Sequence, residues 1–354
     1  MASITVCAIL AWMFYRLIRP LLFRLSPNDA HRLANGALHL LSALRSSAVE
    51  PIDAPGAREL FGLRFRNVVG LAAGFDKSGR YIDDIAQLGF GFIEVGSVTP
   101  RAQPGNPPPN LFRLVEDRAL INRMGFNNDG VEATVRRLEK RRYRGVCGVN
   151  IGKNFDTALE DAPSDYLECL RAVYATADYV TVNISSPNTP GLRNLQGADS
   201  MERLLGELVN AREGLIGTHG KRVPLLVKIA PDLDEAALDS IARVILESGF
   251  DGVVATNTTV SRPASLRSSH QDEKGGLSGE PLRTMSLGVI GSLRAKLGPD
   301  FPMIGVGGIS SVAHGRAVMQ AGAQLIQVYS GLIYEGPSLA TQLVRHVVES
   351  RSRS

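Results

Sequence analysis

Residues 68–77 read VVGLAAGFDK, an apolar run that ends in a glycine and two charged side chains. Seven more short apolar runs follow, and each meets a Gly, Ser, Thr, Asn, Lys or Tyr at its C-terminal edge. This pattern is typical of buried parallel strands in a barrel, where apolar residues pack along the strand and catalytic or binding residues lie at its C-terminal end. The eight runs are 68–73, 92–95, 146–149, 179–182, 225–227, 253–255, 303–306 and 325–328.

Helical patterns separate most of the apolar runs. Alternation of strand and helix predicts parallel βα units, and eight such units over about 290 residues match the size of a (β/α)8 TIM barrel, an α/β fold. Two connections, 99–128 and 185–197, are too long for simple turns and are rich in Asn and Pro, which favours functional loops. The expected helices are 81–88, 131–142, 165–175, 201–215, 235–248, 287–297, 312–321 and 338–349.

A small helical extension precedes the barrel, so we expect segment 1–49 to be helical and 50–354 to form the catalytic domain. Ser26 or Asn28 is positioned to cap the second helix of this extension. The apolar run 4–15 is too short to cross a bilayer, which takes about 20 apolar residues. Arginines set beside large apolar residues predict a segment that lies in the membrane interface, with a helix capping the domain's own core as the alternative.

Composition excludes several classes of function. A net charge of +4, with scattered arginines, gives little support for nucleic-acid binding. The three cysteines show no paired spacing, so neither a disulfide framework nor an iron–sulfur cluster is expected. Among the strand ends only Asp76 offers a carboxylate, and we expect no metal. No histidine lies there, which argues against a Ser-His-Asp triad.

The strand ends carry amides, lysines, hydroxyls and glycines, but no cluster of bases, metal ligands or thiols. An organic cofactor is therefore the simplest source of chemical reactivity. The glycines of 305–310, GVGGIS, and the YSG of 329–331 follow the last two strands, where barrels commonly bind phosphate. A glycine turn that only packs a helix on a strand explains the first motif about as well.

The asparagines suggest the substrate. Because each side chain offers a donor beside an acceptor, several of them together could read a small ring with alternating N–H and C=O groups, while Lys77 could hold a carboxylate. Any single one could instead be a turn residue. The set is Asn122, Asn127, Asn183, Asn188 and Asn257.

Ten strings of the sequence resemble the dihydroorotate dehydrogenase family, and they run in order from about residue 60 to 340. They are LAAGFDK, GSVTPRAQPGNPPPNLFRL, INRMGFNN, GVNIGKN, VNISSPNTPGLRNLQ, LLVKIAPD, NTT, GGLSGEPL, IGVGGI and QVYSGLIYEGP. The resemblance implies an FMN-dependent barrel that oxidises dihydroorotate to orotate in pyrimidine synthesis. Its members differ at the catalytic base, which is Cys in soluble members and Ser in membrane-associated, quinone-reducing ones.

Ser186 occupies the position of the base here, and the helical extension also belongs to the quinone-dependent group. The resemblance therefore implies a peripheral membrane protein on the cytoplasmic face of a bacterial inner membrane, and we expect a monomer. His31 and Arg113 would line the quinone entrance. A soluble fumarate- or NAD-linked enzyme and a non-catalytic flavin-binding barrel remain the alternatives.

The resemblance assigns the remaining roles residue by residue. Ser186 and Lys228 would be catalytic, the first as base and the second beside the flavin ring. Residues that would hold FMN are Ala73, Gly74, Phe75, Asp76, Lys77, Ser97, Asn150, Asn183, Lys228, Thr256, Gly279, Gly308, Tyr329 and Ser330. Residues that would hold dihydroorotate are Lys77, Asn122, Arg123, Met124, Gly125, Phe126, Asn183, Asn188, Asn257 and Thr258.

Overall fold

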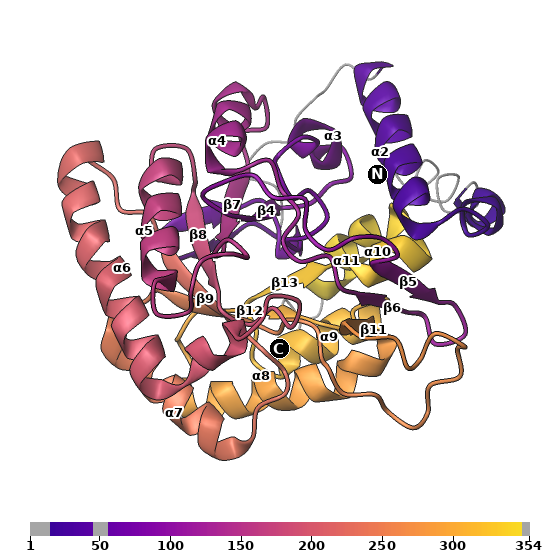
Figure 1. The fold of residues 1–354 in the computed structure, drawn as a ribbon. Helices are drawn as coiled ribbons and strands as arrows, with labels where there is room; N and C mark the ends of the chain where they lie inside the picture. Colours follow the sequence, from indigo (N-terminus) through magenta and orange to yellow (C-terminus); the bar gives the residue numbers. More distant parts are fainter. Residues whose placement is uncertain (1–14, 45–55, 349–354) are drawn as a thin grey trace.

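The structure is a computed structural model that describes residues 15–44 and 56–348. The predicted interfacial run 4–15 and the predicted linker 46–56 therefore lie almost wholly outside the described residues. Eight parallel strands close into a barrel in the order β10-β12-β13-β3-β4-β7-β8-β9. This confirms the predicted (β/α)8 architecture, and helices surround the strands in Figure 1.

All eight predicted strands are present. Each is buried along its whole length, which explains why it appears in the sequence as a largely apolar run. The strands are β3 (Val69–Leu71), β4 (Phe92–Val98), β7 (Val146–Ile151), β8 (Tyr179–Asn183), β9 (Leu225–Ile229), β10 (Gly252–Ala255), β12 (Met303–Val306) and β13 (Leu325–Val328).

The eight expected helices are also present, with small differences at their ends, and α10 (Ser330–Glu335) is an additional helix that was not expected. Tertiary contacts extend α6 by one turn beyond its predicted C-terminal end. The helices are α3 (Ile82–Ala86), α4 (Val131–Lys140), α5 (Ala162–Val173), α6 (Ala198–His219), α7 (Glu235–Ser248), α8 (Arg283–Leu297), α9 (Val312–Gln320), α10 (Ser330–Glu335) and α11 (Ser338–Val348), with short 3-10 turns η1 (Leu192–Gln196) and η2 (Glu280–Leu282).

Two small sheets stand outside the barrel and were not expected. β1 (Arg58–Leu60) and β2 (Leu63–Phe65) form a hairpin. β5 (Leu111–Leu114) and β6 (Ala119–Asn122) lie in the first long connection and pair with β11 (Gly276–Gly279). Because this second sheet carries Asn122 on one strand and Gly279 on another, it brings two distant connections to the same side of the barrel.

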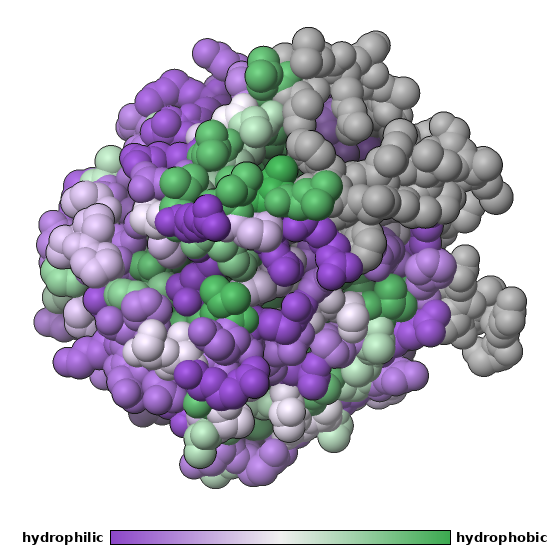
Figure 2. Space-filling model, turned by 90° about the vertical axis from the view of Figure 1, so that its right-hand side faces the viewer, coloured by the Kyte–Doolittle hydropathy of each residue, from purple (hydrophilic) through white to green (hydrophobic). Residues whose placement is uncertain are grey.

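The N-terminal extension lies against the side of the barrel that carries β5, as Figure 1 shows for α2 (Pro27–Leu44). Ser26 caps α2 by accepting a hydrogen bond from the Asp29 backbone N–H at 3.1 Å, which confirms one of the two predicted cap residues. Figure 2 looks onto this side of the molecule and shows apolar side chains gathered in a band. Exposed leucines of the extension are Leu17, Leu21, Leu25, Leu33 and Leu40.

Candidate active site

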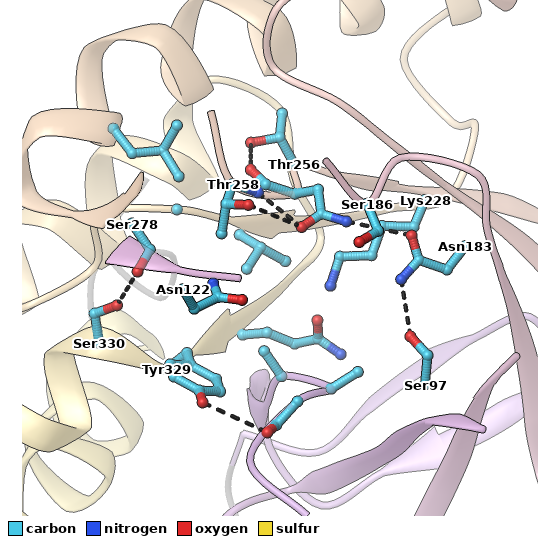
Figure 3. Close-up of a pocket in the computed structure, with 18 of the residues that line it drawn as sticks. Ser97, Asn122, Asn183, Ser186, Lys228, Thr256, Thr258, Ser278, Tyr329 and Ser330 are labelled. Atoms are coloured by element: carbon cyan, nitrogen blue, oxygen red, sulfur yellow. Dashed lines mark hydrogen bonds between the residues drawn. The ribbon is translucent and has the colours of Figure 1, made fainter. Parts of the chain in front are cut away.

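One pocket opens at the barrel mouth where the strands end, and it collects most of the residues that the sequence singled out. Figure 3 shows Ser186, Lys228 and Asn183 at one end of the pocket and the Ser278–Ser330 pair at the other. Predicted site residues that line it are Ala73, Gly74, Lys77, Ser97, Asn122, Met124, Gly125, Phe126, Asn183, Ser186, Asn188, Lys228, Thr256, Asn257, Thr258, Gly279, Gly308, Tyr329 and Ser330.

Four of the residues predicted to hold FMN or dihydroorotate do not line this pocket. Phe75 points toward the N-terminal helices and packs edge-on against His31. Asp76 accepts hydrogen bonds from the backbone of Arg80 and Tyr81, so it orders the turn after β3. Asn150 lies beneath the pocket in the barrel interior.

Arg123 is the fourth of these residues, and it lies beside the pocket rim. Its guanidinium pairs with Glu273 at 2.6 Å and stacks 4.5 Å from the Phe112 ring centre. Asn127, one of the five asparagines of the predicted ring-reading set, does not line the pocket either.

An amide and hydroxyl network forms one wall of the pocket. Asn183 donates to the Ser97 hydroxyl at 2.9 Å and to Asn150 Oδ1 at 3.2 Å. The side-chain oxygen of Asn183 in turn accepts from Asn257 Nδ2 at 3.2 Å and from the Ser185 hydroxyl at 3.1 Å. Because these side chains are bonded to one another, their free atoms face the pocket in fixed directions.

Ser186 lies in the connection after β8 and is 6% exposed. Its Oγ accepts a hydrogen bond from the Asn188 backbone N–H at 3.3 Å. Asn188 also donates from its side chain to Asn122 Oδ1 at 3.0 Å, which joins this connection to β6, the central strand of the small sheet.

Two lysines bring positive charge to the pocket. Desolvation lowers the pKa of Lys77 to about 8, although the charge of Asp76 opposes this shift. Lys77 donates to the Gly74 carbonyl at 2.9 Å and keeps part of its surface open to the pocket. Burial also lowers the pKa of Lys228, and the Glu94 carboxylate opposes that shift. Within the described ranges no cluster of His, Cys, Asp and Glu side chains could hold a metal ion.

The opposite end of the pocket is built from backbone. A Cβ on Gly308, where φ is +68°, would lie 2.5 Å from the Arg283 side chain. A Cβ on Gly331 would lie 2.0 Å from the Ile309 carbonyl oxygen. The side chains of Ser278 and Ser330 join at 2.7 Å beside these glycines. The turn at Gly308 and the start of α10 at Gly331 thus lack side chains where they line the pocket, and this geometry favours close approach of a phosphate to backbone N–H groups.

A row of aromatic rings leads from the N-terminal helices to the pocket. The ring centre of His31 is 4.9 Å from that of Phe75, which is 6.0 Å from that of Tyr329. Burial, with a smaller effect of Lys77, lowers the pKa of His31 to about 4, so the ring is neutral near pH 7. Arg113 donates to the Phe23 carbonyl at 2.9 Å and lies over the Phe23 ring. His31 and Arg113 therefore both lie where the N-terminal extension contacts the barrel.

Sequence reasoning missed Gln327 and Ser278, which also line the pocket. Gln327 lies inside β13, and its Oε1 has no hydrogen-bond partner among the described residues, although the side chain is fully buried. A polar residue within an apolar strand is the signal that could have found it. Ser278 belongs to β11, whose short strand gave no such signal.

These features define a (β/α)8 barrel enzyme with a cofactor pocket at its mouth. The unpartnered Gln327 oxygen, the side-chain-free turns and the surrounding amides suit a ring that bears N–H and C=O groups and a phosphate tail. The family model for dihydroorotate dehydrogenase matches residues 57–350, and the chain belongs to this family. The family is flavin-dependent in general.

Relatives extend the similarity to almost the whole chain. A dihydroorotate dehydrogenase (quinone) of Burkholderia thailandensis is 53% identical over 345 residues, which cover 96% of this chain and 99% of the relative. One from Paraburkholderia xenovorans is 54% identical, covering 94% of this chain and 98% of its own. Among solved structures, a DHODH of Eimeria tenella in complex with ferulenol has a TM-score of 0.85 at 38% identity, covering 92% of each chain.

Substituting Gly308 with alanine tests the phosphate end of the pocket. The added Cβ would collide with Arg283 and strain a left-handed backbone, so we expect the affinity for flavin to fall at least about tenfold. Flavin fluorescence quenching by the apoprotein measures it. Gly288→Ala in α8, where a Cβ meets nothing within 4 Å, is the matched control. Equal affinities in the two variants would contradict this assignment.

Proposed function

We propose that this protein oxidises dihydroorotate to orotate and passes the electrons to a membrane quinone, as a step of pyrimidine biosynthesis. The observation that carries the proposal is the single pocket in which Ser186, two lysines and four asparagines meet at the end of the barrel. Relatives that match almost the full chain bear the name dihydroorotate dehydrogenase (quinone), which supports the same reaction and acceptor.

FMN is the cofactor that we assign to this pocket. Bound there, it would supply the acceptor for the hydride that leaves the substrate ring. Gly308, Tyr329 and Ser330 would hold its phosphate side, and Ala73, Gly74, Ser97 and Gly279 would lie along the ring and its chain. Lys228 would place positive charge where negative charge gathers on reduction, which is most effective away from water. Asn183 and Thr256 would bond the ring, with Asn150 acting through Asn183 and Ser97.

Dihydroorotate would be held by the polar residues that face Lys77 across the pocket. Lys77 would pair with its carboxylate, and the side chains of Asn122, Asn183, Asn188 and Asn257 would read the N–H and C=O groups of its ring. Met124, Gly125, Phe126 and Thr258 complete the lining. Phe75, Asp76 and Arg123 would act from outside the pocket, by shaping its walls.

Ser186 would be the catalytic base. Its Oγ would take the proton from the ring carbon adjacent to the one that loses the hydride. A serine hydroxyl is a poor base unaided, and among the described residues no histidine bonds to it. The proton would therefore leave through a water or a neighbouring hydroxyl, in a pocket where the serine is desolvated and held by the Asn188 backbone.

We assign segment 1–49 to membrane association and quinone access, and 50–354 to catalysis. The five exposed leucines of the extension offer an apolar face that suits an interfacial helix. None of the described helices is long and apolar enough to cross a bilayer. We place the protein as a monomer on the cytoplasmic face of a bacterial inner membrane. His31 and Arg113 would line the quinone entrance, and we expect neither a metal nor a nucleic-acid partner.

Anaerobic mixing with dihydroorotate tests the activity. We expect the flavin absorbance of the purified protein to bleach and to return on addition of a quinone analogue, because the substrate reduces the cofactor and the quinone reoxidises it. A stopped-flow spectrum measures both steps. Reoxidation by fumarate or NAD in place of the quinone would indicate the soluble type, and a spectrum that dihydroorotate leaves unchanged would indicate a non-catalytic barrel.

Substituting Ser186 with alanine tests the base. We expect flavin content to stay near that of the parent protein, while flavin reduction by dihydroorotate slows at least about a hundredfold, since general-base removal typically costs that much. Rapid-mixing kinetics of the half-reaction isolate this step from quinone chemistry. A variant that reduces its flavin at the parent rate would remove Ser186 from the mechanism.

The pKa of Lys77 predicts how orotate binding depends on pH. Below pH 8 the ammonium is present and can pair with the product carboxylate, whereas above pH 8 the charge is lost. The dissociation constant of orotate should therefore rise by up to about tenfold per pH unit above 8, as measured from flavin difference spectra. Lys77→Met should bind weakly at every pH. An affinity that is constant from pH 7 to 9.5 would contradict the role of Lys77.

A further inference from the structure

Glu94 is a fully buried carboxylate inside the barrel, in the middle of the otherwise apolar and small strand β4. Its partners come from β7, β8 and β13, so it faces the centre of the barrel beneath the pocket. Burying a carboxylate costs several kcal/mol unless hydrogen bonds replace its lost water. Because this burial is costly, the presence of Glu94 in the core calls for a structural or functional reason.

Four donors converge on the two oxygens of Glu94. Asn150 Nδ2 donates to Oε1 at 2.9 Å. The Tyr179 hydroxyl at 2.9 Å, the Thr181 hydroxyl at 3.2 Å and Gln327 Nε2 at 2.9 Å all donate to Oε2. A carboxylate can accept but cannot donate. The amides of Asn150 and Gln327 must therefore turn their NH2 groups toward Glu94 and their oxygens away from it.

The orientation of Asn150 then determines the side chains above it. Its Oδ1 faces the pocket wall and accepts from the Ser97 hydroxyl and from Asn183 Nδ2. Because the Ser97 hydrogen is used in this bond, the Ser97 oxygen is left to accept from Asn183. The NH2 of Asn183 is thereby used, and its side-chain oxygen accepts from Asn257. The donor or acceptor role of each side chain is therefore set by the hydrogen bond of the residue below it.

Gln327 is directed in the same way. Since its NH2 bonds Glu94, its Oε1 is left as an acceptor, without a partner among the described residues, on a side chain that lines the pocket. An N–H donor of a bound flavin would satisfy this atom. Hydrogen bonds therefore connect Glu94 to the pocket lining along two separate paths, one through Asn150 and one through Gln327.

We propose that Glu94 is a positioning residue that sets the donor and acceptor direction of the hydrogen bonds lining the flavin pocket. The inference rests on the proposed function, because it assumes that the pocket holds FMN. Without Glu94, the Asn150 and Gln327 amides could adopt either orientation.

A pair of isosteric substitutions tests the proposal through FMN binding. In Glu94→Gln, one oxygen becomes an NH2 group that faces the donating amide of Asn150. We expect FMN to bind the apoprotein at least about tenfold more weakly, as for a buried polar group left unsatisfied. Asn150→Asp alone would place two carboxylates together and should weaken binding by at least as much.

The double variant E94Q/N150D should regain FMN affinity to within about threefold of the parent protein. The new amide at position 94 would donate to the new carboxylate at position 150, which would still accept from Ser97 and Asn183. The carboxylate is thus transferred from position 94 to position 150, and the donor and acceptor directions of the parent protein are restored. Thr181→Val removes one donor to Glu94 without an amide and should change affinity less than about threefold. Fluorescence titration with FMN gives the dissociation constant of each variant, and circular dichroism monitors folding.

The outcomes separate the two hypotheses. If the parent apoprotein does not bind FMN, the proposed function fails. If the parent binds FMN and either single variant binds equally well, Glu94 does not act as proposed. A double variant that is unfolded, or that binds no better than the single variants, also overturns the inference, because a purely space-filling role for Glu94 predicts no recovery from a second substitution.

Discussion

Closure of eight parallel strands into one barrel is the constraint from which the rest of this structure follows. It brings every strand end to one mouth and removes water from the interior, so any polar side chain inside must find a partner in the protein. Asn150, Asn183 and Ser97 satisfy one another there, and Glu94 accepts from four donors below them. The resulting order makes the pocket a preorganised site, whose free atoms already point at the ligand.

In the proposed function, the N-terminal helices add a second entrance to the same pocket. Exposed leucines on their outer side suit an apolar surface, and on their inner side His31, Phe75 and Tyr329 form a row that ends in the pocket lining. A polar substrate would then enter from water and an apolar acceptor past the N-terminal helices. This division would explain why one barrel carries both a set of amides and a helical extension.

Most of this architecture could be predicted from the sequence, since eight apolar runs and the helices between them have clear periodicity. β1, β2, β5, β6 and β11 were missed because they lie outside the barrel and do not alternate with helices as the barrel strands do. Strand-end residues such as Lys77 and Ser186 were placed in the pocket because closure alone brings them together. Glu94 and Gln327 escaped notice because an apolar run does not reveal which way its polar member points. Phe75 and Asp76 follow Gly74 directly, yet the turn directs them away.

A crystal structure of the protein purified with its flavin and soaked with orotate is the most direct measurement. The account predicts an FMN ring between Lys228 and Tyr329, its phosphate at Gly308 and Ser330, and the orotate carboxylate within hydrogen-bond distance of Lys77 Nζ. Flavin density outside the barrel mouth, or orotate bound away from Ser186 and the four asparagines of the pocket, would contradict it.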